Sequence, residues 1–310
     1  MMARSSWPWM VCTFLYEGNM AATSLAVPRT KRLFATWAAW LGLVPFFIFG
    51  LAFEFLPLLT IIQSSLTKNG LLTFQFYRQA MDPLFLASFK NSIQLSVSTA
   101  CLGVLFGTLV AYAIVTTRNK FIQNALTALS DVTTNFGGAP LAFAFIVILG
   151  STGIITVILK QIGINLYPNF RIYSISGLTI AYLYFQLPLM ILIIIPSLHG
   201  LKREWREAAV NLGASTFQYW VRVAVPILFP SLMSGFLLLF ANSFGAYATA
   251  WTLTGSDVNL ITIRIGALIS GEVQLEAELG DALAIISLLI MATCVSGYMV
   301  LSNRSRKAYQ

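Results

Sequence analysis

A polar segment at 204–226 separates two strongly apolar runs and carries residue types suited to recognition of a partner. It reads EWREAAVNLGASTFQYWVRVAVP, after AYLYFQLPLMILIIIPSL and before ILFPSLMSGFLLLFA. Its first part favours a short helix that ends at Gly213, because glycine commonly follows a helix C-terminus. Ser215 can then cap a second helix. The adjacent Ala208 and Ala209 permit close approach of another surface. The segment therefore predicts an elbow that either docks a partner or rests on lipid headgroups.

A second polar stretch, SDVTTNFGGAP at 130–140, lies inside an apolar run. Asp131, Thr134 and Asn135 can contact a solute, and the glycines and proline that follow favour a break in the helix. Polar groups and broken helices inside a bilayer mark functional sites. Asp131 would lie near the midplane, about 15 Å from the cytoplasmic end at about 1.5 Å per residue, where it can meet a cation. The alternative is a kinked helix whose polar groups bond to neighbouring helices.

Further candidates for a solute pathway lie in two other apolar runs. Asn242, Ser243 and Tyr247 belong to the run FANSFGAYATAW, and small and polar residues tend to face the interior of a helix bundle. Glu54, in LAFEFLPLL, is a second acid within an apolar run. It lies nearer the outer end, so pairing inside the bundle or snorkelling to the surface competes with contact to a solute.

No group of residues in the sequence has the spacing of a catalytic site. The phosphate-binding pattern G-x-x-x-x-G-K-[ST] is absent, and so is any metal-ligand cluster. The chain is therefore expected to be a transport subunit and not an enzyme, with no cofactor of its own. If ATP drives it, ATP and Mg²⁺ must bind to another polypeptide.

The composition requires elements that cross a membrane. Hydrophobic residues make up 57% of the chain and charged residues 10%, whereas soluble domains are about 25% charged. Long unbroken apolar runs favour helices over the alternating strands of a barrel. Cys101 and Cys294 lie in such runs and are expected to be small buried hydrophobes. The net charge of +8 fits basic cytoplasmic loops, so no nucleic-acid partner is expected.

Six spans are expected, which would make the protein an all-α bundle in the membrane. They are 34–62, 91–116, 121–149, 174–197, 220–246 and 282–302. With both termini in the cytoplasm, 13 of the 19 Lys and Arg residues lie inside and 6 outside, which favours this orientation. The stretch 1–28 lacks a basic start with a clean apolar core, so we do not interpret it as a signal peptide.

The elbow segment resembles the EAA loop of ABC importer permeases. That loop has Glu-Ala-Ala, three residues, Gly, nine residues and Ile-x-Leu-Pro. This chain keeps the Glu, both Ala, the Gly and the Pro, and has Val at the Ile and Leu positions. MDPLFLASFKNSIQLSVSTACLGVLFGTLVAYAI and GSTGIITVILKQIGI extend the resemblance over 80–302. Among the subgroups, the chain is most similar to permeases of the polyamine, phosphonate and ferric-ion types. Within these, the sequences DPL at 82–84 and AAVNLGAS are most similar to the spermidine/putrescine permeases.

The resemblance implies a six-helix type I importer permease in a bacterial inner membrane. Its parts would be a cytoplasmic extension (1–33), a first span with an outer loop (34–79), a permease core (80–302) and a cytoplasmic tail (303–310). The coupling helix, at 201–213, would fit a groove on an ATPase subunit. Expected partners are two ATPases, a second and non-identical permease, an extracytoplasmic solute-binding protein and membrane lipid. The implied coupling residues are Glu207, Ala208, Ala209, Gly213, Arg206 and Pro226.

The identity of the solute stays open at this stage. Two intramembrane acids fit a polyamine, and the same class of importer also carries phosphonate, ferric ion or other small polar solutes. The broken third span also fits a secondary transporter without an ATPase, and the composition fits a membrane scaffold or sensor. Retention of an ATPase subunit in mild detergent would distinguish an importer permease from a secondary transporter and from a scaffold or sensor.

Overall fold

The computed structural model describes residues 43–68, 70–167, 169–271 and 276–308, with backbone only for 304–308. The predicted extension 1–33 and residues 34–42 of the first predicted span lie outside the described residues. The chain separates into two compact units, Met1–Leu58 and Leu59–Gln310. In the first unit a helix begins at residue 43 and continues through the π-helix η1 (Leu51–Phe55) into the start of α2 (Leu56–Leu66), and the rest of α2 belongs to the second unit.

The second unit is built almost entirely of helices. A short antiparallel pair, β1 (Thr67–Lys68) and β2 (Leu71–Leu72), precedes them, with Thr67 opposite Leu72. The helices are α3 (Gln75–Gln79), α4 (Pro83–Thr116), α5 (Lys120–Thr134), α6 (Gly138–Leu149), α7 (Ile154–Gln161), α8 (Ile175–His199), α9 (Arg203–Asn211), α10 (Thr216–Tyr219), the π-helix η2 (Trp220–Ala224), α11 (Val225–Phe244), α12 (Tyr247–Thr254), α13 (Ile261–Ser270) and α14 (Ala277–Ala308).

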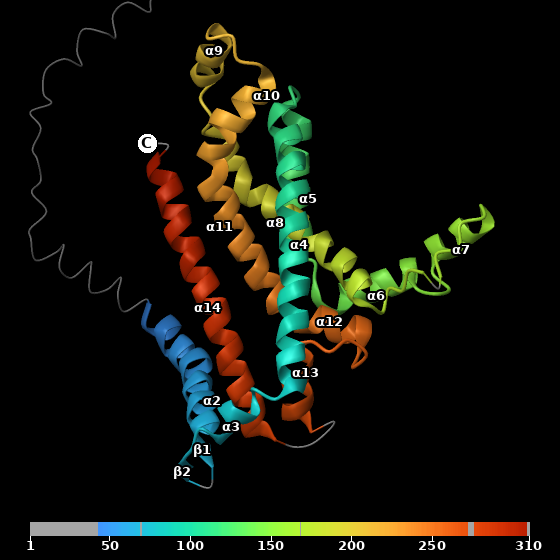
Figure 1. Cartoon of the computed structure of the whole chain (residues 1–310), viewed down its shortest axis with the longest axis vertical. Helices are drawn as coiled ribbons and strands as arrows, with labels where there is room; N and C mark the ends of the chain where they lie inside the picture. The colour runs from blue at the N-terminus through green and yellow to red at the C-terminus, as the bar shows by residue number, and fades with distance from the viewer. Residues whose placement is uncertain (1–42, 69, 168, 272–275, 309–310) are drawn as a thin grey trace, which may run out of the picture. The chain divides into compact units, whose positions relative to one another are not determined.

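The long helix α4 is central to the packing of this unit. It packs against α8 and α11, while α14 packs against α11 and α13. The elbow helices α9 and α10 lie at one end of α4, and α3 lies at the other (Figure 1). Gly103 and Gly107 face the partners of α4. A Cβ atom on Gly107 would lie 2.7 Å from Cβ of Met190, so this close approach requires glycine.

Six helical stretches among the described residues are long and apolar enough to cross a membrane, as predicted. They are Leu43–Leu66, Pro83–Thr116, Gly138–Gln161, Ile175–His199, Thr216–Phe244 and Ala277–Asn303. The bounds predicted for the third span, 121–149, were wrong. The chain there forms two helices, and the apolar stretch that qualifies as a span begins at Gly138. The polar residues of α5 lower its hydropathy, and the glycines after it end it.

The expectation that both apolar-run cysteines are buried was also wrong. Cys101 is exposed on α4, and Cys294 is only partly buried on α14. Apolar runs in a membrane helix supply residues to every face, so position within a run does not determine burial inside the protein.

Candidate functional site

Two of the helices that could line a solute pathway are broken at the same level of the second unit. α5 ends at Thr134, and α6 begins at Gly138, whose φ of +72° is readily adopted only by glycine. α11 ends at Phe244, and α12 begins at Tyr247, three residues later. The first break is the one predicted from the glycines and proline of SDVTTNFGGAP. The second was not predicted.

The backbone groups that the breaks release find partners in neighbouring helices. Oγ1 of Thr249 on α12 accepts a hydrogen bond from N–H of Gly138 at 3.0 Å and donates to C=O of the same residue at 3.3 Å. The hydroxyl of Tyr182 on α8 donates to C=O of Ala246 at 2.7 Å. An unpaired backbone group costs several kcal/mol in lipid. The hydrogen bonds from Thr249 and Tyr182 therefore stabilise the two breaks.

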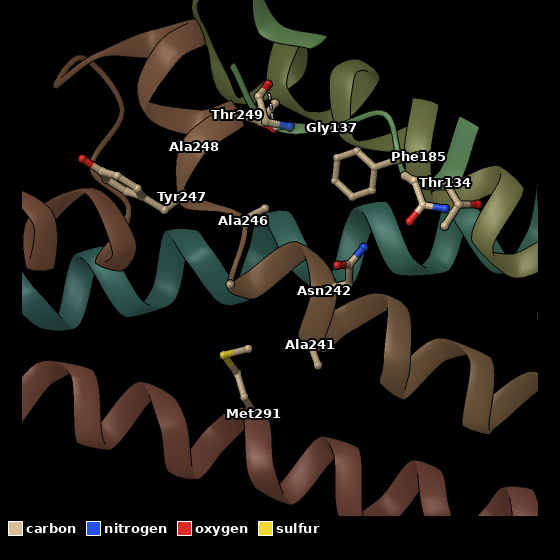
Figure 2. A pocket seen from close by; sticks show the side chains of 13 residues that line it. Thr134, Gly137, Phe185, Ala241, Asn242, Ala246, Tyr247, Ala248, Thr249 and Met291 are labelled. Atoms are coloured by element: carbon tan, nitrogen blue, oxygen red, sulfur yellow. Dashed lines mark hydrogen bonds between the residues drawn. The ribbon is translucent and has the colours of Figure 1, made fainter. Parts of the chain in front are cut away.

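A cavity of about 550 Å³ lies between the two breaks. Its walls come from the end of α5 and start of α6, from the end of α11 and start of α12, and from α8 and α14 (Figure 2). The amide of Asn242 points into this space, toward the ring of Phe185, and Met291 approaches from α14 (Figure 2). The lining residues are Thr134, Asn135, Gly137, Gly138, Phe185, Ala241, Asn242, Gly245, Ala246, Tyr247, Ala248, Thr249 and Met291.

None of these lining residues carries a formal charge. The cavity instead offers neutral donors and acceptors from Thr134, Asn135, Asn242 and Tyr247, beside aromatic and apolar walls. The ends of four helices meet at its wall, so partly positive N-termini and partly negative C-termini are both close by. This arrangement suits a small polar solute bound by hydrogen bonds.

The structure brings four of the seven predicted pathway residues together at this cavity: Thr134, Asn135, Asn242 and Tyr247. Asp131 lines a different cavity, closer to the elbow, together with His199. Ser243 is buried and faces α4, away from the cavity lining. Glu54 belongs to the other compact unit, where it lies exposed on η1.

Ser243 takes part in a buried polar contact that joins three helices. Oγ of Ser243 on α11 lies 3.0 Å from Oγ1 of Thr99 on α4, and Nε2 of Gln186 on α8 donates to that same oxygen at 3.0 Å. Gln186 is fully buried, and its Oε1 has no hydrogen-bond partner among the described residues. The neighbours of these residues in sequence, Phe185 and Asn242, line the cavity, so the contact fixes two of its walls.

The lining residues that were not singled out from the sequence include Phe185, Thr249 and Met291. Phe185 and Met291 lie within uniformly apolar runs, where nothing in the pattern marks which face looks inward. Thr249 follows an unpredicted break. In the structure Met291 packs against Gly245, where a Cβ would lie 2.9 Å from Cε of Met291.

The predicted elbow is present and is fixed by hydrogen bonds at both helix ends. Gly213 has φ +78°, and its N–H bonds to C=O of Val210 while N–H of Ala214 bonds to C=O of Ala209. These two bonds form a Schellman motif. Ser215 and Gln218 then form a complete capping box at the start of α10. Gly213 and Ser215 therefore act as the sequence predicted.

The elbow presents an apolar surface to solvent. Leu212 is 88% exposed and Phe217 is 76% exposed, and Ala208 and Arg206 of α9 are exposed as well. Nε of Arg203 donates to Oε1 of Glu207 at 2.8 Å in an exposed i, i+4 ion pair. Such pairs contribute little to stability, so the Glu207 carboxylate can exchange partners. Pro226 is the second residue of α11 and lies exposed behind the elbow.

Comparison with known proteins identifies a family and several relatives. Residues 103–307 match the model of the family described as "Binding-protein-dependent transport system inner membrane component". The chain is 27% identical over 229 residues to chloroplastic sulfate permease 2 of Chlamydomonas reinhardtii, with 74% of this chain and 57% of that protein aligned. It is 27% identical over 249 residues to the spermidine/putrescine permease PotB of Haemophilus influenzae (78% and 85%). It is 29% identical over 228 residues to the ferric transport permease FbpB of Actinobacillus pleuropneumoniae (70% and 31%).

The fold is also that of solved importers. A bacterial ABC transporter that imports alginate matches with a TM-score of 0.68 at 17% identity, over 89% of this chain and 98% of that one. A second structure, described as in complex with an alginate pentasaccharide-bound periplasmic protein, matches with a TM-score of 0.64 at 16% identity, over 90% and 98%. Because the family model matches about two thirds of its length, the chain belongs to the binding-protein-dependent inner membrane components, the permease subunits of ABC importers.

Proposed function

We propose that the chain forms half of the translocation pathway of an importer and transmits movement from ATPase subunits through its elbow. The observation that carries this proposal is the exposed elbow at α9–α10. Glu207, Ala208, Ala209 and Gly213 lie on α9 and on the Schellman turn that ends it, and Leu212 and Phe217 are exposed beside them. An apolar surface of this kind on a short helix favours burial against another protein.

The remaining parts of the importer follow from this role. ATP and Mg²⁺ bind to two ATPase subunits, which close around the nucleotide and pull on the elbow. α8 enters the elbow and α11 leaves it, so both helices move with it, and both also line the first cavity. A second permease, non-identical in the polyamine subgroup, completes the pathway, and an extracytoplasmic binding protein delivers the solute. The membrane would be the bacterial inner membrane, with both termini cytoplasmic.

The solute is a small polar molecule, and a polyamine is the specific candidate from the sequence. The relatives include sulfate, spermidine/putrescine and ferric permeases, so they leave the charge of the solute open. The first cavity holds no formal charge in its lining and therefore accepts solutes of either sign. Any selection by charge must occur elsewhere along the path or in the binding protein.

Glu207→Lys tests the elbow directly. In the tagged importer purified in mild detergent, we expect this variant to retain at least roughly tenfold less ATPase subunit than the parent, because a reversed charge costs a buried ion pair about 1.4 kcal/mol or more. Unchanged retention would remove the proposed role of the carboxylate. A parent chain that never retains an ATPase would instead favour a secondary transporter or a scaffold.

Two control variants separate docking from the helix's own stability. Glu204→Lys makes the same change of charge on α9 at a position outside the family pattern. Arg203→Ala removes the ion pair with Glu207 but keeps the carboxylate. Both should retain the ATPase close to the parent level. Equal loss in all three variants would mean that α9 itself had been destabilised.

A further inference from the structure

A second cavity, of about 640 Å³, lies between α5 and α8 on the elbow side of the first. Its polar lining comes from Lys120, Gln123, Asn124, Thr127 and Asp131 of α5 and from His199, the last residue of α8; Ala128, Leu192 and Ile195 complete it. Of these residues, only Asp131 was predicted from the sequence to have a role.

The polar residues of α5 form one continuous stripe. At 3.6 residues per turn, positions 120, 123, 124, 127, 131, 134 and 135 fall within roughly a 120° arc of the helix. The last two of these, Thr134 and Asn135, line the first cavity, and the others line the second. The stripe therefore connects the two cavities along about 22 Å of helix, at about 1.5 Å per residue.

The opposite face of α5 is apolar and exposed. Leu129 is 61% exposed and Val132 is 68% exposed. Around the helix, Leu129 lies roughly 180° and Val132 roughly 120° from the middle of the stripe. Such a face suits lipid or an apolar protein surface, whereas a stripe with Lys, Asn and Asp does not. Only the striped face suits water.

The charges of the second cavity are separated along the helix. Asp131 lies at the end nearer the first cavity, and its carboxylate has no ion pair within the described part of the chain. Lys120, the first residue of α5, lies at the elbow end with His199. A lysine at a helix end can extend its ammonium group to the membrane surface. Asp131 is thus the fixed charge deepest in the cavity.

We infer that the second cavity is a water-filled exit vestibule, and that Asp131 makes it prefer solutes with a cationic, amine-type group. This inference rests on the proposed permease function. A solute released from the neutral first cavity would pass along the stripe, exchange hydrogen bonds with Asn124 and Thr127, and leave beside His199. A solute with a cationic group gains attraction at Asp131, and an anion is repelled there.

Cysteine labelling in the assembled importer tests the inference. Cys12, Cys101 and Cys294 are first replaced by serine, and Asn124→Cys, Ala128→Cys or Leu129→Cys is then added singly. Inside-out vesicles are treated with two impermeant methanethiosulfonate reagents, one carrying a trimethylammonium group and the other a sulfonate. We expect Asn124→Cys and Ala128→Cys to react at least roughly tenfold faster than the matched control Leu129→Cys. Equal rates at all three positions, or no reaction at Asn124→Cys and Ala128→Cys, would contradict a water-filled vestibule.

The charge preference has its own readout. Ala128 lies three residues from Asp131 and so neighbours it on the helix. The cationic reagent should react faster than the anionic one at Ala128→Cys, and adding Asp131→Asn should lower that ratio roughly three- to tenfold, as expected for one charge near 6 Å in water. An unchanged ratio would overturn the role of Asp131. Retention of the ATPase in the same preparations reports separately on the proposed function.

Discussion

At the scale of single residues, Gly213 shows how one backbone conformation shapes a partner surface. Its φ of +78° closes α9, and no atom lies within 4 Å of the position a Cβ would take. Space is therefore available for a side chain, and only the left-handed backbone resists substitution. That strain costs an L-residue about 1 kcal/mol, and asparagine tolerates the conformation better than alanine or valine.

Substitution of Gly213 should therefore loosen the elbow in a defined order. We expect limited trypsin digestion at the elbow of the purified chain to quicken about fivefold for Gly213→Ala, the equivalent of about 1 kcal/mol. Gly213→Asn should have a smaller effect, and Gly213→Val a larger one. If Gly213→Asn speeds digestion as much as Gly213→Val, then side-chain size and not backbone strain determines the effect of substitution at this position.

At the scale of elements, the contact of α4 with α8 depends on two glycines one turn apart. A Cβ on Gly107 would meet Cβ of Met190 at 2.7 Å and C=O of Leu187 at 3.2 Å. A Cβ on Gly103 would meet Cδ2 of Leu239 at 2.6 Å, and that atom is the end of a flexible side chain. The obstacle at Gly107 is close to the backbone of α8, so it cannot rotate away.

Gly107→Ala should thus destabilise the bundle more than Gly103→Ala. Overpacking of this kind costs about 1–3 kcal/mol, and we expect the lower thermal midpoint in detergent for Gly107→Ala. Gly103→Ala serves as the matched control, since it adds the same methyl group to the same face. The opposite order would mean that α4 and α8 separate easily and that Leu239 is the rigid neighbour.

The elements also show what the sequence could and could not predict. Runs of apolar residues specified the number of spans, and Gly213 with Ser215 specified the elbow, because both signals are local. The break before Gly138 was predictable for the same reason. The break after Phe244 was not, because it depends on the Tyr182 hydroxyl bonding to C=O of Ala246 from another helix. Phe185 and Met291 reach the cavity because of how their helices pack. A uniformly apolar run has no periodicity that would indicate which of its residues face inward.

At the scale of the whole molecule, the predicted orientation in the membrane rests on the charges of the two tails. In the predicted topology, the segments between spans hold six Lys and Arg residues on each side. The excess inside comes from Arg4, Arg29, Lys31 and Arg32 before the first span and from Arg304, Arg306 and Lys307 after the last. Charges close to the ends of spans direct insertion, so the residues just before residue 34 should carry much of the signal.

Reporter fusions test this orientation. Alkaline phosphatase, which is active only outside the cytoplasm, should be active when fused after Asp257 and inactive when fused after Leu201 or Gln310. Activity after Leu201 would place the elbow outside, away from any cytoplasmic ATPase, and would contradict both the orientation and the proposed coupling.

Changing Arg29, Lys31 and Arg32 together to glutamine should produce a mixed population, with some activity after Leu201. A matched change of Lys68, Arg78 and Lys90 to glutamine should leave the pattern unchanged, because it removes positive charge from the outer side and so strengthens the same bias.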